Sequence, residues 1–333
     1  MDMGVVTFSL VFLIAVALFF DFINGMHDSA NSIATIVSTR VLKPQYAVLW
    51  AAFFNLAAFF ILSTHVATTV GKGIVDPALI DDAMVFGALA GAITWNIITW
   101  RLGIPSSSSH ALIGGIVGAG IAKAGVGAIK WSGLSKTIYA IVLSPFTGFL
   151  LGMLLMLLVS WLFVRANPAF ADGLFRKLQL ISAALYSLGH GSNDAQKTAG
   201  IISVLLFSHG MYAEFTVPAW VIFSCYTVMG LGTLMGGWRI VHTMGSKITR
   251  LTPTQGACAE TAGAITLFMA TYLGIPVSTT HTITGAIVGV GSARRVSAVR
   301  WNIATGIVYA WVITMPAAGI MAALFYWLVH FVL

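Results

Sequence analysis

Two polar motifs each occur twice in this sequence, and they occur in the same order. Asp28 stands in Gly-Met-His-Asp-Ser-Ala-Asn, and Asp194 stands in Gly-Ser-Asn-Asp-Ala-Gln-Lys, 166 residues later. His110 ends Gly-Ile-Pro-Ser-Ser-Ser-Ser-His, and His281 ends Gly-Ile-Pro-Val-Ser-Thr-Thr-His, 171 residues later. Because the two shifts are so similar, the sequence indicates that a unit of about half the chain was duplicated.

The Gly-Ile-Pro motif has the form of a helix start that can bind an anion. In both copies a proline and a run of hydroxyl residues precede an apolar helical pattern. The first turn of a helix has free backbone N–H groups and partial positive charge, and the hydroxyls add donors. Two such starts facing each other could surround a small tetrahedral oxyanion, although simple capping of membrane helices is the alternative. His110 and His281 could donate to the anion, orient the hydroxyls or be structural.

Acidic side chains are rare, and three of the ten lie within apolar segments: Asp28, Asp194 and Glu260. Asp21 falls at the end of the first apolar stretch. An ionised group at the bilayer centre costs about 3 kcal/mol on insertion scales, so such residues commonly mark ion or proton pathways. For Asp194 a structural salt bridge with Lys197, three positions further on, is the alternative.

The composition excludes an ordinary soluble protein. Of the 333 residues, 58% are hydrophobic and only 8% are charged, against about 25% charged in soluble domains. The two cysteines lie in apolar stretches, which excludes a disulfide scaffold. The net charge of +7 comes from scattered basic residues, which fit loops at a membrane surface better than nucleic acid. We therefore expect a multi-pass protein of the cell membrane that needs no cofactor.

The apolar pattern predicts an all-α membrane protein with about 10–12 transmembrane and re-entrant segments. Residues 5–20 are expected to stay as a membrane helix and not as a cleaved signal peptide. Repeats would span residues 1–170 and 171–333. Duplicated halves with short apolar segments are typical of secondary transporters. The short segments, interpreted as half-helices or re-entrant hairpins, are residues 29–38, 107–122, 193–207 and 278–290.

The distribution of basic residues leaves open whether the halves are inverted or parallel. It also leaves open which side of the membrane each loop faces. A homodimer is compatible with the sequence.

The paired motifs resemble those of the PiT family of inorganic phosphate transporters, over nearly the whole chain. The resemblance implies inverted repeats, with phosphate between the two hydroxyl-rich helix starts and cation coupling at the aspartate motifs. The substrate ligands that it implies are Ser107, Ser108, Ser109, Ser278, Thr279 and Thr280. The coupling-ion residues that it implies are Asp28, Asn31 and Asp194, with Glu260 close to both sites.

The second copy departs from the sodium-coupled pattern of that family. Lys197 occupies the position equivalent to Asn31, and its ammonium group would fill or repel a cation site. His27 precedes Asp28, and imidazole changes charge near physiological pH. We therefore expect import of inorganic phosphate by symport with a proton, with Lys197 as part of the coupling site. Coupling to sodium at Asp28 and Asn31 is the alternative, and no other metal is expected.

Two other functions compete with phosphate transport. A sulfate permease would use the same donors. Phosphate, however, carries P–OH groups that can donate to buried carboxylates, whereas sulfate has no hydrogen to donate. An intramembrane serine hydrolase would need one asymmetric serine and histidine pair, whereas the serine and histidine motif occurs twice in register. The sequence therefore favours a transporter over an enzyme.

Overall fold

The computed structural model describes residues 8–61 and 63–332. Apart from one β-bridge between Val75 and Ile129, the regular structure in this part of the chain is helical. The α-helices are α1 (Phe8–Ser38), α2 (Pro44–Ala57), α3 (His65–Gly73), α4 (Asp82–Leu102), α5 (Ser108–Ala124), α6 (Trp131–Leu162), α7 (Pro168–Ser208), α8 (Ala219–Met235), α9 (Trp238–His242), α10 (Pro253–Tyr272), α11 (Thr279–Arg294) and α12 (Trp301–Val332).

Five helical segments in the described residues are long and apolar enough to cross a membrane. They begin at Phe8, Pro44, Asp82, Trp131 and Trp301. A sixth span results if the pair Ala219–Met235 and Trp238–Lys247, bent by 65°, counts as one. α6 and α12 expose rows of large apolar side chains, as lipid-facing helices do. The protein is therefore an all-helical, multi-pass membrane protein.

Several of the expected short segments are parts of longer helices. Residues 29–38 belong to α1, which continues from Phe8 without a break, and residues 193–207 are the end of the 41-residue helix α7. Both predictions of separate half-helices were wrong, because polar residues inside a buried helix look like breaks in the apolar pattern. The start of the first predicted span, residues 5–7, lies outside the described residues.

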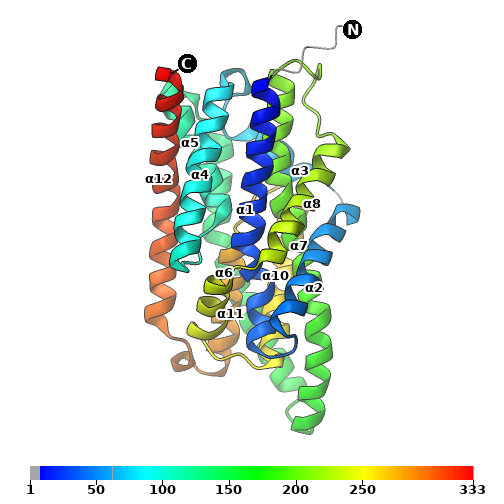
Figure 1. Cartoon of the computed structure of the whole chain (residues 1–333). Coiled ribbons are helices and arrows are strands. Elements are labelled where there is room, and N and C mark those ends of the chain that lie inside the picture. The colour runs from blue at the N-terminus through cyan, green and yellow to red at the C-terminus, as the bar shows by residue number, and fades with distance from the viewer. Residues whose placement is uncertain (1–7, 62, 333) are drawn as a thin grey trace.

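The two remaining short segments form α5 and α11, whose starts meet inside the protein. Ser109 Oγ at the start of α5 donates to the carbonyl oxygen of Val277, just before α11, at 3.3 Å. From this meeting point α5 occupies the upper half of the view and α11 the lower half (Figure 1). Both helix starts are buried, so their partial positive charges lie close together inside the protein.

Each Gly-Ile-Pro motif reverses the chain between a long helix and the following short one. Gly103 and Gly274 adopt φ of +67° and +68°, which glycine tolerates and other residues rarely adopt. The next amides, of Ile104 and Ile275, bond back to Thr99 and Ala270 at 2.9 and 2.8 Å. This is the 6→1 bond of a Schellman helix end, so the glycines end α4 and α10 in the same way.

Small residues let the outer helices approach the short ones closely. α6 packs on α11 and α12 packs on α5. A Cβ atom added at Gly285 of α11 would lie 2.1 Å from the carbonyl oxygen of Pro145 in α6, and one at Gly118 would lie 2.1 Å from that of Gly319 in α12. Glycine contacts of this kind hold membrane helices together without polar bonds.

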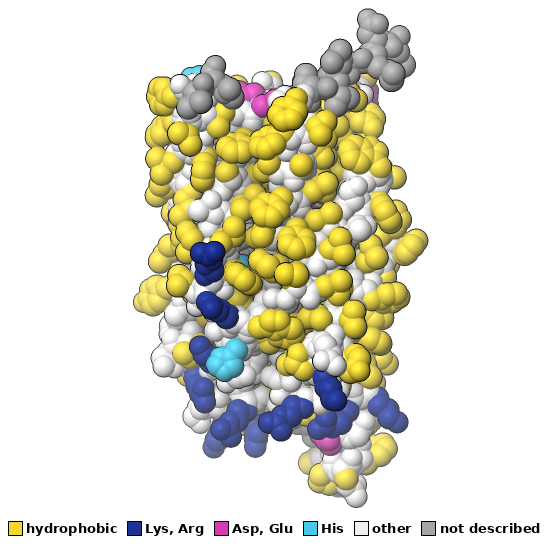
Figure 2. All heavy atoms as spheres, viewed as in Figure 1, with side chains coloured by type: hydrophobic (Ala, Val, Ile, Leu, Met, Phe, Trp, Pro, Cys, Tyr) yellow, Lys and Arg dark blue, Asp and Glu magenta, His cyan; other side chains and the backbone are white. Residues whose placement is uncertain are grey.

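The two ends of the molecule differ in charge. We call the end where α1 and α11 finish and α7 and α12 begin the basic end; Lys and Arg side chains gather there in the lower part of Figure 2. Its basic residues include Arg40, Lys43, Arg165, Arg176, Lys177, Arg250, Arg294, Arg295 and Arg300. The opposite end, which we call the mixed end, carries Lys72, Lys123, Lys130 and Lys136 together with Asp76, Asp81, Asp82 and Glu214.

Candidate functional site

The six predicted hydroxyl residues lie together at the meeting point of α5 and α11, and all are at least 97% buried. Ser107 and Ser278 are the N-caps: their hydroxyls accept from the amides of His110 and His281 at 3.2 and 3.1 Å. A capping hydroxyl keeps its own hydrogen and can still donate it to an oxyanion. The structure thus brings two capped helix starts and their hydroxyls to one place.

Asp28 lies beside the start of α5, with His27 as its closest partner. Nδ1 of His27 is 2.7 Å from Oδ1 of Asp28, and Ser108 Oγ donates to the same oxygen at 3.1 Å. Nε2 of His27 lies 3.1 Å from Thr99 Oγ1 and 3.3 Å from Ser106 Oγ. The first aspartate motif therefore contacts the first hydroxyl motif directly.

Asp194 lies in the same way beside the start of α11. Thr279 Oγ1 donates to Oδ2 of Asp194 at 3.2 Å. The ammonium of Lys197 bonds to Oδ1, and Nε2 of His190 lies 3.3 Å from Oδ2. All of these side chains are buried. The equivalent aspartates thus have different cationic or titratable partners, histidine for Asp28 and lysine plus histidine for Asp194.

The side chains of Asn31 and Lys197 each bond to the hydroxyl motif of the other half of the chain. Asn31 Nδ2, on α1, donates to Thr279 and Thr280 of α11 at 3.2 and 3.0 Å. Lys197, on α7, donates to Ser109 of α5 and to the carbonyl oxygen of Val277. Equivalent positions therefore make equivalent contacts with the opposite hydroxyl motif, but only one of them contributes a positive charge.

Glu260 of α10 belongs to an adjacent cluster nearer the basic end. Its carboxylate accepts from Thr35 at 2.6 Å, from Gln179 at 3.0 Å and from Ser182 at 2.5 Å. Thr35 lies seven residues beyond Asp28 on α1, which is two helical turns or about 10 Å. Glu260 is therefore near the central site, but its hydrogen bonds go to another set of side chains.

The two motif histidines contact each other on the side of the helix starts that faces α12. The ring centroids of His110 and His281 are 4.3 Å apart, and His281 stacks on Trp311 at 3.7 Å. Neither imidazole makes a hydrogen bond of good geometry within the described residues, although a backbone group of Ile141 lies beside His281. The two rings therefore contribute packing between α5 and α11, and their nitrogens do not orient the serines.

One group of side chains could hold a cation. A ligand atom from each of Asp28, His190 and Asp194 lies within 4.8 Å of the other two. Nδ1 of His190 faces Asn55 Oδ1 at 3.1 Å and Ser32 Oγ at 3.4 Å, so Nε2 is the nitrogen that faces the two aspartates. The ammonium of Lys197 is already paired with Asp194, so the three side chains have less negative charge left with which to bind a metal ion.

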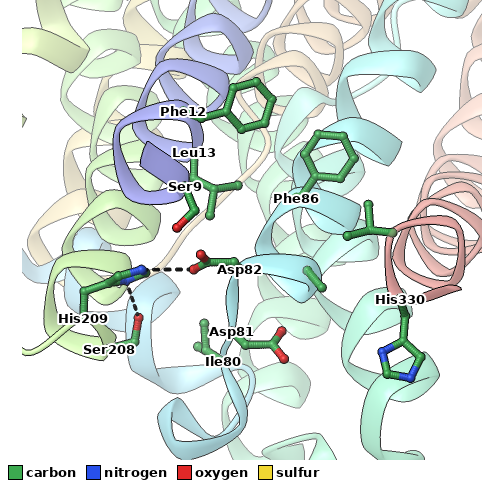
Figure 3. A pocket seen from close by; sticks show the side chains of 12 residues that line it. Ser9, Phe12, Leu13, Ile80, Asp81, Asp82, Phe86, Ser208, His209 and His330 are labelled. Atoms are coloured by element: carbon green, nitrogen blue, oxygen red, sulfur yellow. Dashed lines mark hydrogen bonds and ion pairs between the residues drawn. The ribbon is translucent and has the colours of Figure 1, made fainter. Parts of the chain in front are cut away.

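A pocket of about 640 Å³ at the mixed end is separate from this centre. Figure 3 shows its lining, in which Asp82 and His209 form an ion pair at 3.3 Å below the rings of Phe12 and Phe86. None of the predicted site residues lines it. Its walls are mostly apolar, and it lacks the converging donors of the central site.

Sequence reasoning missed several polar side chains that complete the site. Thr99 and Ser106 hold His27, His190 faces Asp194, and Gln179 and Ser182 hold Glu260. Ser106 was within the repeated motif and His190 is one residue before the second aspartate motif. Gln179 and Ser182 gave no comparable signal, because nothing in the sequence shows that α7 packs against α10.

Buried facing helix starts, hydroxyl donors and intramembrane carboxylates are typical of membrane transport proteins. The chain belongs to the phosphate transporter family, whose sequence pattern matches residues 24–322. It is 68% identical over 318 residues to the "probable low-affinity inorganic phosphate transporter" of Rhizobium meliloti (strain 1021), covering 95% of each chain. It is 44% identical over 325 residues to the protein of that name from Bacillus subtilis (strain 168), covering 97% of each.

The fold has also been seen in a solved structure. "The sodium-dependent phosphate transporter" superposes with a TM-score of 0.88 over 98% of this chain and 100% of that chain, at 23% identity. That likeness shows the fold alone. The chain is thus a membrane inorganic phosphate transporter and not an enzyme, which confirms the family and substrate predicted from the motifs.

Proposed function

We propose that this protein imports inorganic phosphate across the cell membrane by symport with a proton. Phosphate would bind between the starts of α5 and α11, held by Ser108, Ser109, Thr279 and Thr280 and by backbone N–H groups. Ser107 and Ser278 would donate from their capping positions. The coupling residues would be Asp28, Asn31, Asp194, Lys197 and Glu260.

The hydrogen bonds of His27 support a proton as the coupling ion. Ser106 donates its hydrogen to Thr99 Oγ1, and Thr99 donates to the carbonyls of Trp95 and Asn96. Both hydroxyl oxygens therefore offer lone pairs to Nε2, while Asp28 offers a carboxylate oxygen to Nδ1. Both ring nitrogens face acceptors, so the His27 and Asp28 pair has room for one exchangeable proton beyond a neutral imidazole and a carboxylate. The acceptors at both ring nitrogens of His27 are the main observation in support of proton symport.

Lys197 supports the same conclusion from the other half. Its ammonium occupies the position that Asn31 has in the first half, bonds to Asp194 and reaches Ser109. A fixed ammonium supplies the positive charge that a bound sodium ion would otherwise bring, and it also attracts the phosphate. Sodium at Asp28 and Asn31 remains the second candidate, because those oxygen atoms suit a hard cation.

We further propose two inverted repeats, residues 1–170 and 171–333, with the basic end in the cytoplasm. α5 and α11 run in opposite directions from their meeting point, as inverted repeats require (Figure 1). Cytoplasmic loops carry the excess of Lys and Arg, which assigns the mixed end to the outside. Import would then run from the mixed end to the basic end.

Phosphate is favoured over sulfate by the carboxylates next to the hydroxyls. Asp28 and Asp194 each accept from a hydroxyl of the proposed anion site. A P–OH group could donate to such a carboxylate, whereas sulfate would meet repulsion. Excess unlabelled sulfate should therefore leave phosphate uptake unchanged.

The proposed function is tested with purified protein in liposomes, using labelled phosphate and imposing sodium and pH gradients separately. We expect an inward proton gradient to stimulate uptake, and sodium in place of potassium at constant pH to have little effect. Uptake that requires sodium and ignores the pH gradient would contradict proton symport.

A further inference from the structure

Asp21 is a buried carboxyl group inside the membrane that the central site does not use. It lies in the middle of the continuous helix α1, not at the end of a span, and it is fully inaccessible to solvent. Oδ1 accepts a hydrogen bond from Thr198 of α7 at 3.0 Å. Oδ2 accepts no hydrogen bond of good geometry within the described residues, although the Asn24 amide on α1 and the Cys225 thiol on α8 lie beside the carboxyl group.

The surroundings of Asp21 disfavour a bare carboxylate. Cys225 and Tyr226 of α8 and Lys197 and Asp194 of α7 are the titratable groups around it. Lys197 is bonded to Asp194, so its charge is already paired. An ionised carboxylate that accepts a single strong hydrogen bond, from Thr198, costs several kcal/mol in a membrane interior. A proton on Oδ2 removes this charge.

The position of Asp21 relates it to the central site. Asp21 and Asp28 are seven residues apart on α1, so they share a helix face at a separation of about 10 Å. α1 runs from the mixed end to the basic end, which places Asp21 on the mixed-end side of Asp28. Thr35, the partner of Glu260, lies seven residues beyond Asp28 on the other side. Three buried carboxyl groups therefore lie at successive levels along one face of α1: Asp21 and Asp28 on α1 itself, and Glu260 on α10 opposite Thr35.

We propose that Asp21 is the outer proton-binding site of the transporter, which loads the coupling proton before it reaches His27 and Asp28. This inference rests on proton symport as the proposed function. When the mixed-end side opens, hydronium in the entering water protonates the Asp21 carboxylate. The O–H bond at Asp21 then breaks as the proton passes through that water to the His27 and Asp28 pair, and Asp21 is left as a carboxylate for the next proton.

The test compares two transport modes of the same liposomes. Exchange of labelled for unlabelled phosphate at equal pH reports the anion site, and uptake against a proton gradient reports coupling. For Asp21→Asn we expect exchange within twofold of wild type and proton-driven uptake reduced at least tenfold. Asp21→Glu keeps a titratable group and should retain both modes with a shifted pH profile. Asp82→Asn, at the half-exposed carboxylate in Figure 3, is the matched control and should resemble wild type in both.

Two results would overturn the role of Asp21: proton-driven uptake by Asp21→Asn equal to wild type, or loss of exchange together with uptake. Asp21→Ser repeats the test if the asparagine variant fails to insert, because serine stands at position 187, the equivalent place in α7. A wild-type protein that ignores the pH gradient would instead refute proton symport itself, so the two failures are distinguishable.

Discussion

Lys197, on α7, donates a hydrogen bond from its ammonium to the hydroxyl of Ser109 at the start of α5. The same ammonium bonds to Asp194 and to the carbonyl oxygen of Val277. A single buried cation therefore touches an acidic residue and both helix starts at which phosphate would bind. The ammonium group can therefore pair with Asp194 before phosphate binds and with phosphate afterwards, so that it is never an unpaired charge in the membrane.

Replacing Lys197 with asparagine should weaken phosphate binding and proton-driven uptake. A hydrogen bond to a charged group contributes about 1.5–3 kcal/mol, so the apparent phosphate affinity should fall about tenfold or more. The measurement is the phosphate concentration at half-maximal exchange in liposomes. Because asparagine is the residue at the equivalent position 31, a gain of sodium dependence would identify Lys197 as the substitute for an ion.

The control for this prediction is Lys123→Asn at the mixed end, where a partly exposed lysine pairs with Asp81. Its loss should not change the phosphate affinity. Wild-type affinity in Lys197→Asn would show that the ammonium serves only the fold.

Replacing Ser108 or Thr279 with alanine should also reduce phosphate affinity. Each lost neutral hydrogen bond is worth on the order of 0.5–1.5 kcal/mol, or about 3 kcal/mol if the acceptor is charged. The two substitutions should act similarly, because each hydroxyl donates to the aspartate in its own half of the chain. Ser160→Ala, at an exposed position on α6, is the matched control. Unchanged affinity in both site variants would contradict a shared anion site.

The repeated motifs were sufficient to predict that the two hydroxyl-rich helix starts lie together, but not how the chain brings them there or which side chains bond to them. The contacts of Asp28 with Ser108 and of Asp194 with Thr279 are equivalent, as expected for a duplicated unit, because each pair lies within one half. α1 and α7 could not be recognised as continuous helices, because their buried polar residues lower the local hydropathy just where the site lies. The burial of Asp21 was missed for the same reason. Contacts between the halves, such as that of Asn31 with Thr280, depend on packing that no local pattern encodes.

Glu260→Gln should slow proton-driven uptake and leave phosphate exchange largely intact. The carboxylate accepts hydrogen bonds from Thr35, Gln179 and Ser182, and a glutamine can reproduce only part of this acceptor set. Since the cluster lies about two helical turns from Asp28, the anion site should be little disturbed. Initial rates of both transport modes test this. A loss of exchange equal to the loss of uptake would place Glu260 in phosphate binding.

Gly285→Ala should destabilise the protein by about 1–3 kcal/mol through overpacking between α11 and α6. The added Cβ would lie 2.1 Å from the carbonyl oxygen of Pro145, which is backbone and cannot move aside as a side chain would. Gly306→Ala in α12 is the control, because no atom lies within 4 Å of a Cβ there. The midpoint of thermal unfolding in detergent should fall only for Gly285→Ala. Equal midpoints would mean that the α6 and α11 contact is looser than the structure shows.

Asp28→Asn and Asp194→Asn should each abolish proton-driven uptake, for different reasons. Asparagine at position 28 keeps the size of the side chain but removes the carboxylate that pairs with His27, so the exchangeable proton loses its site. Asparagine at position 194 leaves Lys197 without its carboxylate partner, so the ammonium should hold phosphate more tightly and slow its release. Equilibrium binding of labelled phosphate to purified protein separates the two: affinity should stay near wild type or fall for Asp28→Asn and rise for Asp194→Asn. If both variants instead keep proton-driven uptake, the two buried aspartates are structural and the coupling proton binds elsewhere.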